Sequence, residues 1–319
     1  MKQNWHCFKC PIKTRDVSKG ASLLNRKQYL IKLIFTGTFC LSLLTGCSVQ
    51  NYALQNVGNL LSKESVSTDD DLELLKHASA YHLKLSESIL QEIPDHVQLA
   101  ESVTRGYAQY AYVFLMDEAD RTESDSVQQA SLLRNRAAKM LGRAKSTGLK
   151  TLSLYYPGLL EQLEGKPIAK PLAISQSHVG LTYWSMTAWA GAISLSKDSP
   201  DVVADLPAVI QLSELAWKAN PKYDHGALAS MMGTLELSKP GGKAETAQKY
   251  HDLAIQWRGD QIAPLVAKAE NWAVATQNKD AFVQLLQQAI ALSDKQKDLT
   301  NTVMGRRARW LLDNVDNYF

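Results

Sequence analysis

The side chains that could do chemistry are few and scattered along this sequence. No pair of histidines has the HExxH spacing that places two imidazoles on one helix face for zinc. The sequence also lacks a GxSxG turn for a nucleophilic serine, and it has no GxGxxG or Walker-type loop for phosphates. We therefore expect neither an enzyme nor a metal or other cofactor site. The histidines that follow residue 46 are His77, His82, His96, His178, His225 and His251.

Cysteine chemistry is confined to the N-terminal part of the chain. Cys7 and Cys10 form a CxxC, but no second pair follows to complete a four-cysteine zinc site. The run Leu44-Thr45-Gly46-Cys47 is an aliphatic residue, two small residues and a cysteine, which resembles the bacterial lipobox. In that class of protein the thiol is joined to diacylglycerol and the chain is cut before the cysteine. We expect Cys47 to be lipidated; the alternative is a plain signal peptide with a chance cysteine.

The residues before Cys47 have the features of an export signal. Arg26, Lys27 and Lys32 form a positive flank, and the apolar run from residue 33 to 44 is too short to span a bilayer. We expect residues 1–46 to be a lipoprotein signal segment and Cys47 to carry the palmitate-type acyl chains of a membrane anchor. Ser48 stands where Asp marks inner-membrane retention in enteric bacteria. It favours the periplasmic face of the outer membrane over the inner membrane.

Removal of the signal segment changes the charge of the chain. The whole sequence has 35 Lys and Arg against 32 Asp and Glu, a net charge of +3. Eight of the basic residues and one of the acidic residues precede Cys47, so the remainder has 27 against 31, or −4. The basic excess therefore belongs to the signal segment. Nothing in the charge of the remaining chain indicates a nucleic-acid partner.

The rest of the chain predicts an all-α protein. Residues 47–68 are polar and are expected to be the lipid-attachment site and a tether, and residues 69–319 a helical domain. Sustained period-2 alternation is absent, whereas apolar residues recur at helical spacing between Pro and Gly stops. About eleven helices are expected, near residues 72–93, 96–116, 124–145, 152–163, 177–195, 205–219, 223–237, 242–257, 262–277, 280–292 and 299–317. We expect the first to have an acidic start at Asp69–Asp71, the third to be ended by Gly148, and the fourth to be interrupted near Pro157-Gly158.

Three of these helices carry a similar line of residues. Its alanines, Ala216, Ala254 and Ala289, are 38 and 35 residues apart. This spacing resembles the tetratricopeptide repeat, in which small residues let two antiparallel helices pack closely. The strict Trp-Leu-Gly-Tyr signature is absent. We therefore expect a tetratricopeptide-like α-solenoid with degenerate repeats.

Several motifs, in their order along the chain, resemble the TRAP-transporter-associated T-component family. The resemblance covers roughly residues 70–319. The motifs are Gly106–Ala111, Tyr183–Trp189 with Ile193–Asp198, Asp205–Pro207, Tyr223–Ala227, Pro240–Gly242, Ala269–Val274 and Arg306–Leu312.

The resemblance implies a periplasmic lipoprotein with a tetratricopeptide-like fold and no catalytic residues. It implies a solute-binding protein of a TRAP system as partner, self-association, and the passage of a small hydrophobic ligand. The expected function is partner docking or ligand handover in TRAP-type uptake. The alternative is a lipoprotein scaffold for envelope assembly.

Residue type and this resemblance select the side chains expected to contact a partner or ligand. Trp184 and Trp189 stand at helical spacing, where core packing is the alternative. Arg306 begins an Arg-Arg-Ala-Arg run whose members either pair internally or contact an anionic ligand. Asp205 and Tyr223 complete the set.

Overall fold

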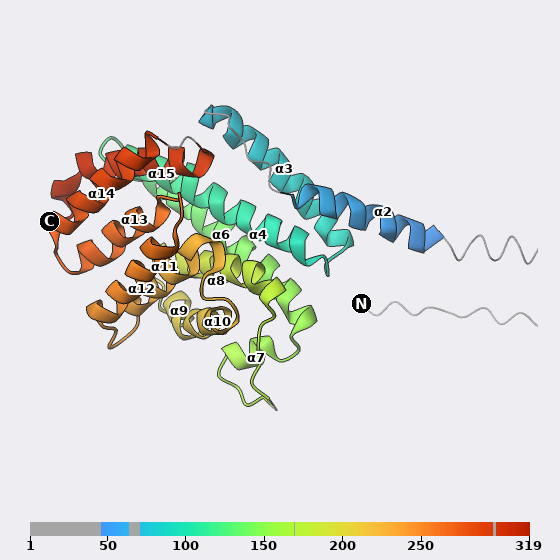
Figure 1. Cartoon of the computed structure of the whole chain (residues 1–319). Coiled ribbons are helices and arrows are strands. Elements are labelled where there is room, and N and C mark those ends of the chain that lie inside the picture. The colour runs from blue at the N-terminus through green and yellow to red at the C-terminus, as the bar shows by residue number, and fades with distance from the viewer. Residues whose placement is uncertain (1–45, 64–70, 169, 296–297) are drawn as a thin grey trace, which may run out of the picture. The chain divides into compact units, whose positions relative to one another are not determined.

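The computed structural model describes residues 46–63, 71–168, 170–295 and 298–319 (Figure 1). The chain divides into two compact units, and we call Ala53–Phe319 the helical unit. Apart from Gly46, the expected signal segment lies outside the described residues, as do residues 64–68 of the expected tether. The rest of that tether is α-helical as far as Leu61. Helix α2 spans Gly46–Leu61 and contains Cys47.

Polar side chains fix the starts of the next two helices. Helix α3, Leu72–Glu92, begins after Asp71, whose carboxylate accepts hydrogen bonds from the backbone N–H groups of Glu73 and Leu74. Helix α4, Val97–Tyr110, begins after His96, whose Nδ1 accepts from the Leu99 N–H at 3.1 Å. Both caps satisfy donors that a helix start leaves unpaired. The predicted acidic start of the first domain helix is confirmed.

The next predicted helix, 96–116, changes its geometry part-way. Helix α4 passes into a π-helical turn, η1, at Ala111–Met116, and then into α5, Asp117–Thr122. Such π turns insert a residue into the helical ladder and re-aim the side chains that follow. Here the residues that follow include the acidic side chains of α5.

Helix α6 is longer than the sequence predicted. It spans Val127–Tyr155, whereas Gly148 was expected to end it near residue 145. Gly148 instead lies inside the helix. Its missing side chain allows α6 to pack closely against α8, Val179–Ser194. A Cβ at Gly148 would lie 1.9 Å from the Ser185 Oγ of α8. The glycine is a packing residue and not a terminator.

Helix α8 lies at the centre of the unit, between α6, α4 and α10, Leu206–Ala219 (Figure 1). Most of its residues are buried on all sides, as expected for a helix enclosed by others. The chain reaches it through α7, Leu159–Leu163, and the short 3₁₀ turn η2, Gln176–His178. It leaves through α9, Pro200–Val203. The break at Pro157-Gly158 was predicted, and Gly158 has φ 87°.

The remaining helices pack mainly on their sequence neighbours. Helix α11 pairs with α12, and α14 with α15. A second hydrophobic cluster, from Ile262 to Leu311, lies apart from the larger one, which runs from Leu83 to Leu235. The elements are α11 Tyr223–Ser238, α12 Ala244–Trp257, α13 Ala263–Ala267, the π-helical turn η3 Lys268–Ala273, α14 Lys279–Ser293, α15 Leu299–Asp313 and the 3₁₀ turn η4 Val315–Asn317.

The all-α class is confirmed, because the described residues contain helices and no strand. The tetratricopeptide-like solenoid stays a prediction. Pairing of neighbouring helices agrees with it. Some contacts depart from nearest-neighbour stacking, among them the pair of Arg307 of α15 with Asp120 of α5 at 2.8 Å, across 187 residues.

Candidate functional site

Two of the predicted contact residues, Trp189 and Asp205, lie together. The Trp189 indole Nε1 donates to Asp205 Oδ2 at 2.8 Å, and Lys145 Nζ donates to the same oxygen at 2.8 Å. The Lys145 ammonium lies 3.9 Å from the centre of the Trp189 ring. Trp189 is 6% exposed. These contacts join α6, α8 and the start of α10, so Trp189 and Asp205 stabilise the packing of three helices.

Trp184 and Tyr223 are also brought together, through Tyr183. The Tyr183 ring centre lies 5.2 Å from Trp184 and 5.2 Å from Tyr223. The Tyr223 hydroxyl donates to Glu101 Oε1 of α4 at 3.4 Å. A polar group therefore ends this row of rings, in which Trp184 and Tyr223 keep partial solvent exposure.

Around Tyr223 several ionisable groups are desolvated. Burial raises the pKa of the Glu101 carboxyl and of Asp224, and it lowers the pKa of the Arg105 guanidinium. The backbone here is left-handed at three successive residues, with φ of 46° at Asp224, 50° at His225 and 88° at Gly226. Such geometry is costly for residues with a Cβ and is held only by its surroundings. It lets Gly226 approach α12, where a Cβ would lie 2.7 Å from the Ala254 carbonyl oxygen.

Arg306 belongs to a different cluster, at the start of the C-terminal half of α15. Its guanidinium lies 3.5 Å from Asp117 of α5 and is half exposed. Its neighbour Arg307 bonds Glu270 of η3 at 2.8 Å and Asp120 of α5 at 2.8 Å. The internal pairing considered for this arginine run is therefore present. The acidic partners are placed by the two π-helical segments.

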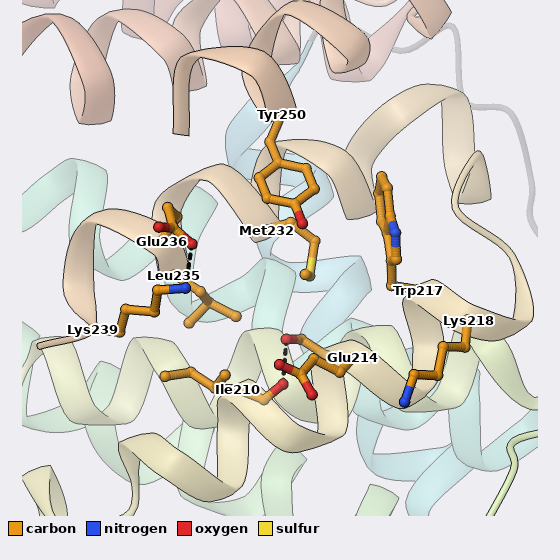
Figure 2. A pocket seen from close by; sticks show the side chains of 10 residues that line it. Ile210, Glu214, Trp217, Lys218, Met232, Leu235, Glu236, Lys239 and Tyr250 are labelled. Atoms are coloured by element: carbon orange, nitrogen blue, oxygen red, sulfur yellow. Dashed lines mark hydrogen bonds and ion pairs between the residues drawn. The ribbon is translucent and has the colours of Figure 1, made fainter. Parts of the chain in front are cut away.

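A pocket of about 140 Å³ lies between α10, α11 and α12, and we call it the α10–α12 pocket. Figure 2 shows Tyr250 and Met232 on one side of it, Ile210 and Glu214 of α10 opposite, and the Trp217 ring rising from α10 at the right. The Trp217 ring meets Tyr250 edge to face at 5.2 Å. The lining is completed by Ser213, Lys218, Leu235, Glu236 and Lys239.

The rim of the α10–α12 pocket carries charges of both signs. Glu214 and Lys218 are exposed on α10, and Lys239 pairs with Glu236 at 2.5 Å on the other edge. An aromatic centre with a charged rim is the composition of a protein-binding patch. The volume supports the same interpretation, because pockets for small molecules usually measure about 300–1,000 Å³. The α10–α12 pocket suits a single side chain of a partner better than a whole solute.

The sequence model of the TRAP transporter T-component family matches residues 68–319, which is nearly all of the helical unit. This chain belongs to the TRAP transporter T-component family. Association with a TRAP transporter follows from that membership, and the family is not an enzyme family. No curated protein matches the chain.

This T-component has a second, more polar cleft of about 320 Å³. Gln55 and Asn59 of α2 line it together with Tyr155 and His178. His178 Nδ1 and the Tyr156 hydroxyl share a hydrogen bond of 2.8 Å, and burial lowers the pKa of His178. The lining offers hydrogen-bonding groups and little apolar surface. It differs in this from the hydrophobic ligand site that the family resemblance implies.

The described part of the chain offers neither a cluster of metal-binding side chains nor a membrane-spanning helix. Among these residues no three His, Cys, Asp or Glu side chains gather closely enough to hold a metal ion. No helix in the described ranges is both long and apolar enough to cross a membrane.

The sequence missed most of the residues that line these sites. The sequence does not reveal that Glu101 and Arg105 of α4 lie near Asp224 of α11, because the two helices are far apart in the chain. A signal did exist for the α10–α12 pocket. Trp217 and Tyr250 are 33 residues apart, close to one tetratricopeptide period, and the predicted repeats would place them on equivalent helices.

Proposed function

We propose that this T-component is anchored by acyl chains on Cys47 at the periplasmic face of the outer membrane, and that it docks the solute-binding protein of its TRAP system. The anchor rests on the Leu-Thr-Gly-Cys motif and the short apolar run before it. Family membership supports the transport role. The observation that carries the docking role is the α10–α12 pocket, which has an aromatic centre, a rim of both charges and room for one side chain.

Docking, more than ligand handover, is the function that this geometry supports. Trp189, expected to face a ligand, is 6% exposed and bonded to Asp205. At the α10–α12 pocket, Trp217, Met232 and Tyr250 combine apolar character with partial access to solvent. They would receive a hydrophobic side chain of the partner, while the rim selects its charged neighbours.

The test is a binding titration between the purified T-component and the solute-binding protein of the same TRAP system. Reversing the rim with Glu214→Lys or Lys218→Glu should weaken binding, and Trp217→Leu should weaken it further. Glu161→Lys at an exposed position of α7 is the matched control and should bind as the unchanged protein does. Circular dichroism shows that each variant is folded. Equal affinity of all variants would exclude the pocket as the docking site.

A further inference from the structure

One exposed stripe of α2 is apolar and lies close in sequence to the lipidation site, with exposed asparagines beside it. Ala53, Val57 and Leu60 are spaced at i, i+4 and i+7, which places them on one side of the helix. All three are exposed, Val57 to 40% and Leu60 to 66%. Two exposed aliphatic side chains on consecutive turns form a patch that water solvates poorly.

The opposite face of the same stretch is held on the helical unit. Leu54 and Leu61 pack against the main hydrophobic cluster. Gly58 allows close approach, because a Cβ there would lie 2.8 Å from Ile93 Cδ1. Asn59 Oδ1 lies 3.1 Å from His96 Nε2. The helix therefore cannot turn its apolar stripe inward, and Val57 and Leu60 must face outward.

Two properties of the sequence indicate what covers this face. From Gly46 to Leu61 the helix has no charged residue. Val57 follows Cys47 by ten residues, which reach at most about 35 Å even when fully extended. A face this close to an acylated cysteine stays near the lipid surface, and the absence of charge removes the cost of bringing charged groups to the acyl boundary.

We propose that the Ala53–Leu60 face of α2 lies on the lipid leaflet that holds the acyl chains of Cys47, and so fixes the orientation of the domain on the membrane. This inference rests on the proposed lipid anchor. Because α2 has no charge, the contact is apolar and requires no anionic lipid. Residues that the sequence predicted to be a tether would thereby hold the domain against the membrane. This contact would restrict the directions that the α10–α12 pocket can face.

The cysteine content of the chain provides a direct test. After cleavage before Cys47 and its acylation, Val57→Cys or Leu60→Cys introduces the single free thiol. The full chain is expressed with its signal, purified, labelled there with an environment-sensitive fluorophore and reconstituted into phosphatidylcholine vesicles. Gln287→Cys on the exposed face of α14 is the control. Lipids with nitroxide groups near the head group then report contact with the leaflet.

We expect blue-shifted emission and quenching by nitroxide lipids at positions 57 and 60, and neither at 287. Adding phosphatidylglycerol or salt should change nothing. Flotation of the protein with the vesicles measures the anchor separately. If the protein floats but the labels at 57 and 60 stay as water-exposed as the label at 287, the contact of α2 with the leaflet is refuted and the anchor stands. If shielding follows only from adding the solute-binding protein, the face is a protein contact and the inference fails. If the protein does not float, the anchor and this inference both fail.

Discussion

His251 should make the stability of the domain depend on pH. It is fully buried in α12, against Gly233 of α11, where a Cβ would lie 2.7 Å from its ring. Neither ring nitrogen has a hydrogen-bond partner among the described residues. Burial lowers the pKa of His251 to about 4, and the positive charge of Lys268 adds to this effect while Asp252 opposes it. The folded protein therefore holds a neutral imidazole.

The sign of the effect follows from proton binding in the two states. The ordinary pKa of histidine, about 6.5, applies to the unfolded chain. Below that pH the unfolded state therefore binds a proton that His251 in the folded state does not bind. Stability is therefore lost as the pH falls from about 6.5 toward 4. A difference of about 2.5 pKa units corresponds to roughly 3 kcal/mol at the acid limit, and to roughly 2 kcal/mol near pH 5.

The perturbation is His251→Leu, which removes the titrating group and both unpaired nitrogens. Urea unfolding between about pH 5 and pH 8 gives the free energy of unfolding of each protein. The stability of the variant relative to the parent should rise by roughly 2 kcal/mol as the pH falls over this range. His77→Leu removes an exposed histidine as the control and should leave the slope unchanged. If the free energies of unfolding of the parent and of His251→Leu change with pH in parallel, protonation of His251 does not destabilise the folded state. That result would refute the prediction.

Two further sets of substitutions test the packing and the charge pairs of the domain. Gly148→Ala should cost about 1–3 kcal/mol, because the added Cβ meets Ser185, whereas Gly142→Ala in the same helix has nothing within 4 Å and should add about 0.5–1 kcal/mol. Equal thermal shifts for the two would contradict the close α6–α8 contact. Arg307→Met should cost about 2–3 kcal/mol by urea unfolding, because it strands the desolvated Glu270, and Arg309→Met at an exposed pair about 0–1 kcal/mol. Adding Glu270→Gln should restore part of the loss; no recovery would mean that Glu270 is not the group left uncompensated.

Much of the fold was predictable because its signals are local. The helix start at Asp71 follows from a side chain next to the backbone that it caps, and the break at Pro157-Gly158 from the conformations of those two residues. The class follows from apolar periodicity. Gly148 was misjudged for the converse reason. Whether a glycine ends a helix or admits a neighbour depends on the neighbour, here Ser185, which lies 37 residues further along the chain.

The candidate sites were predictable only in part. Trp189 and Asp205 were both selected from the sequence, but the contact with Lys145 that makes them a structural cluster was not. Tyr223 was selected without Glu101, its partner 122 residues away. Residue type indicates what a side chain can do, whereas its burial and its partner decide whether it remains available to a ligand.

By itself the sequence determined the helical class, the acidic start of the first domain helix, the resemblance to the T-component family and the lipobox prediction, because each depends on residues near one another in the chain. The tertiary structure alone decided which groups meet and which lose their water. It paired Arg307 with Asp120 across 187 residues, left the nitrogens of His251 without partners inside the core, and turned Val57 and Leu60 outward by fixing the other side of α2. Desolvation and charge pairing depend on distance in space, and distance along the chain does not reveal it.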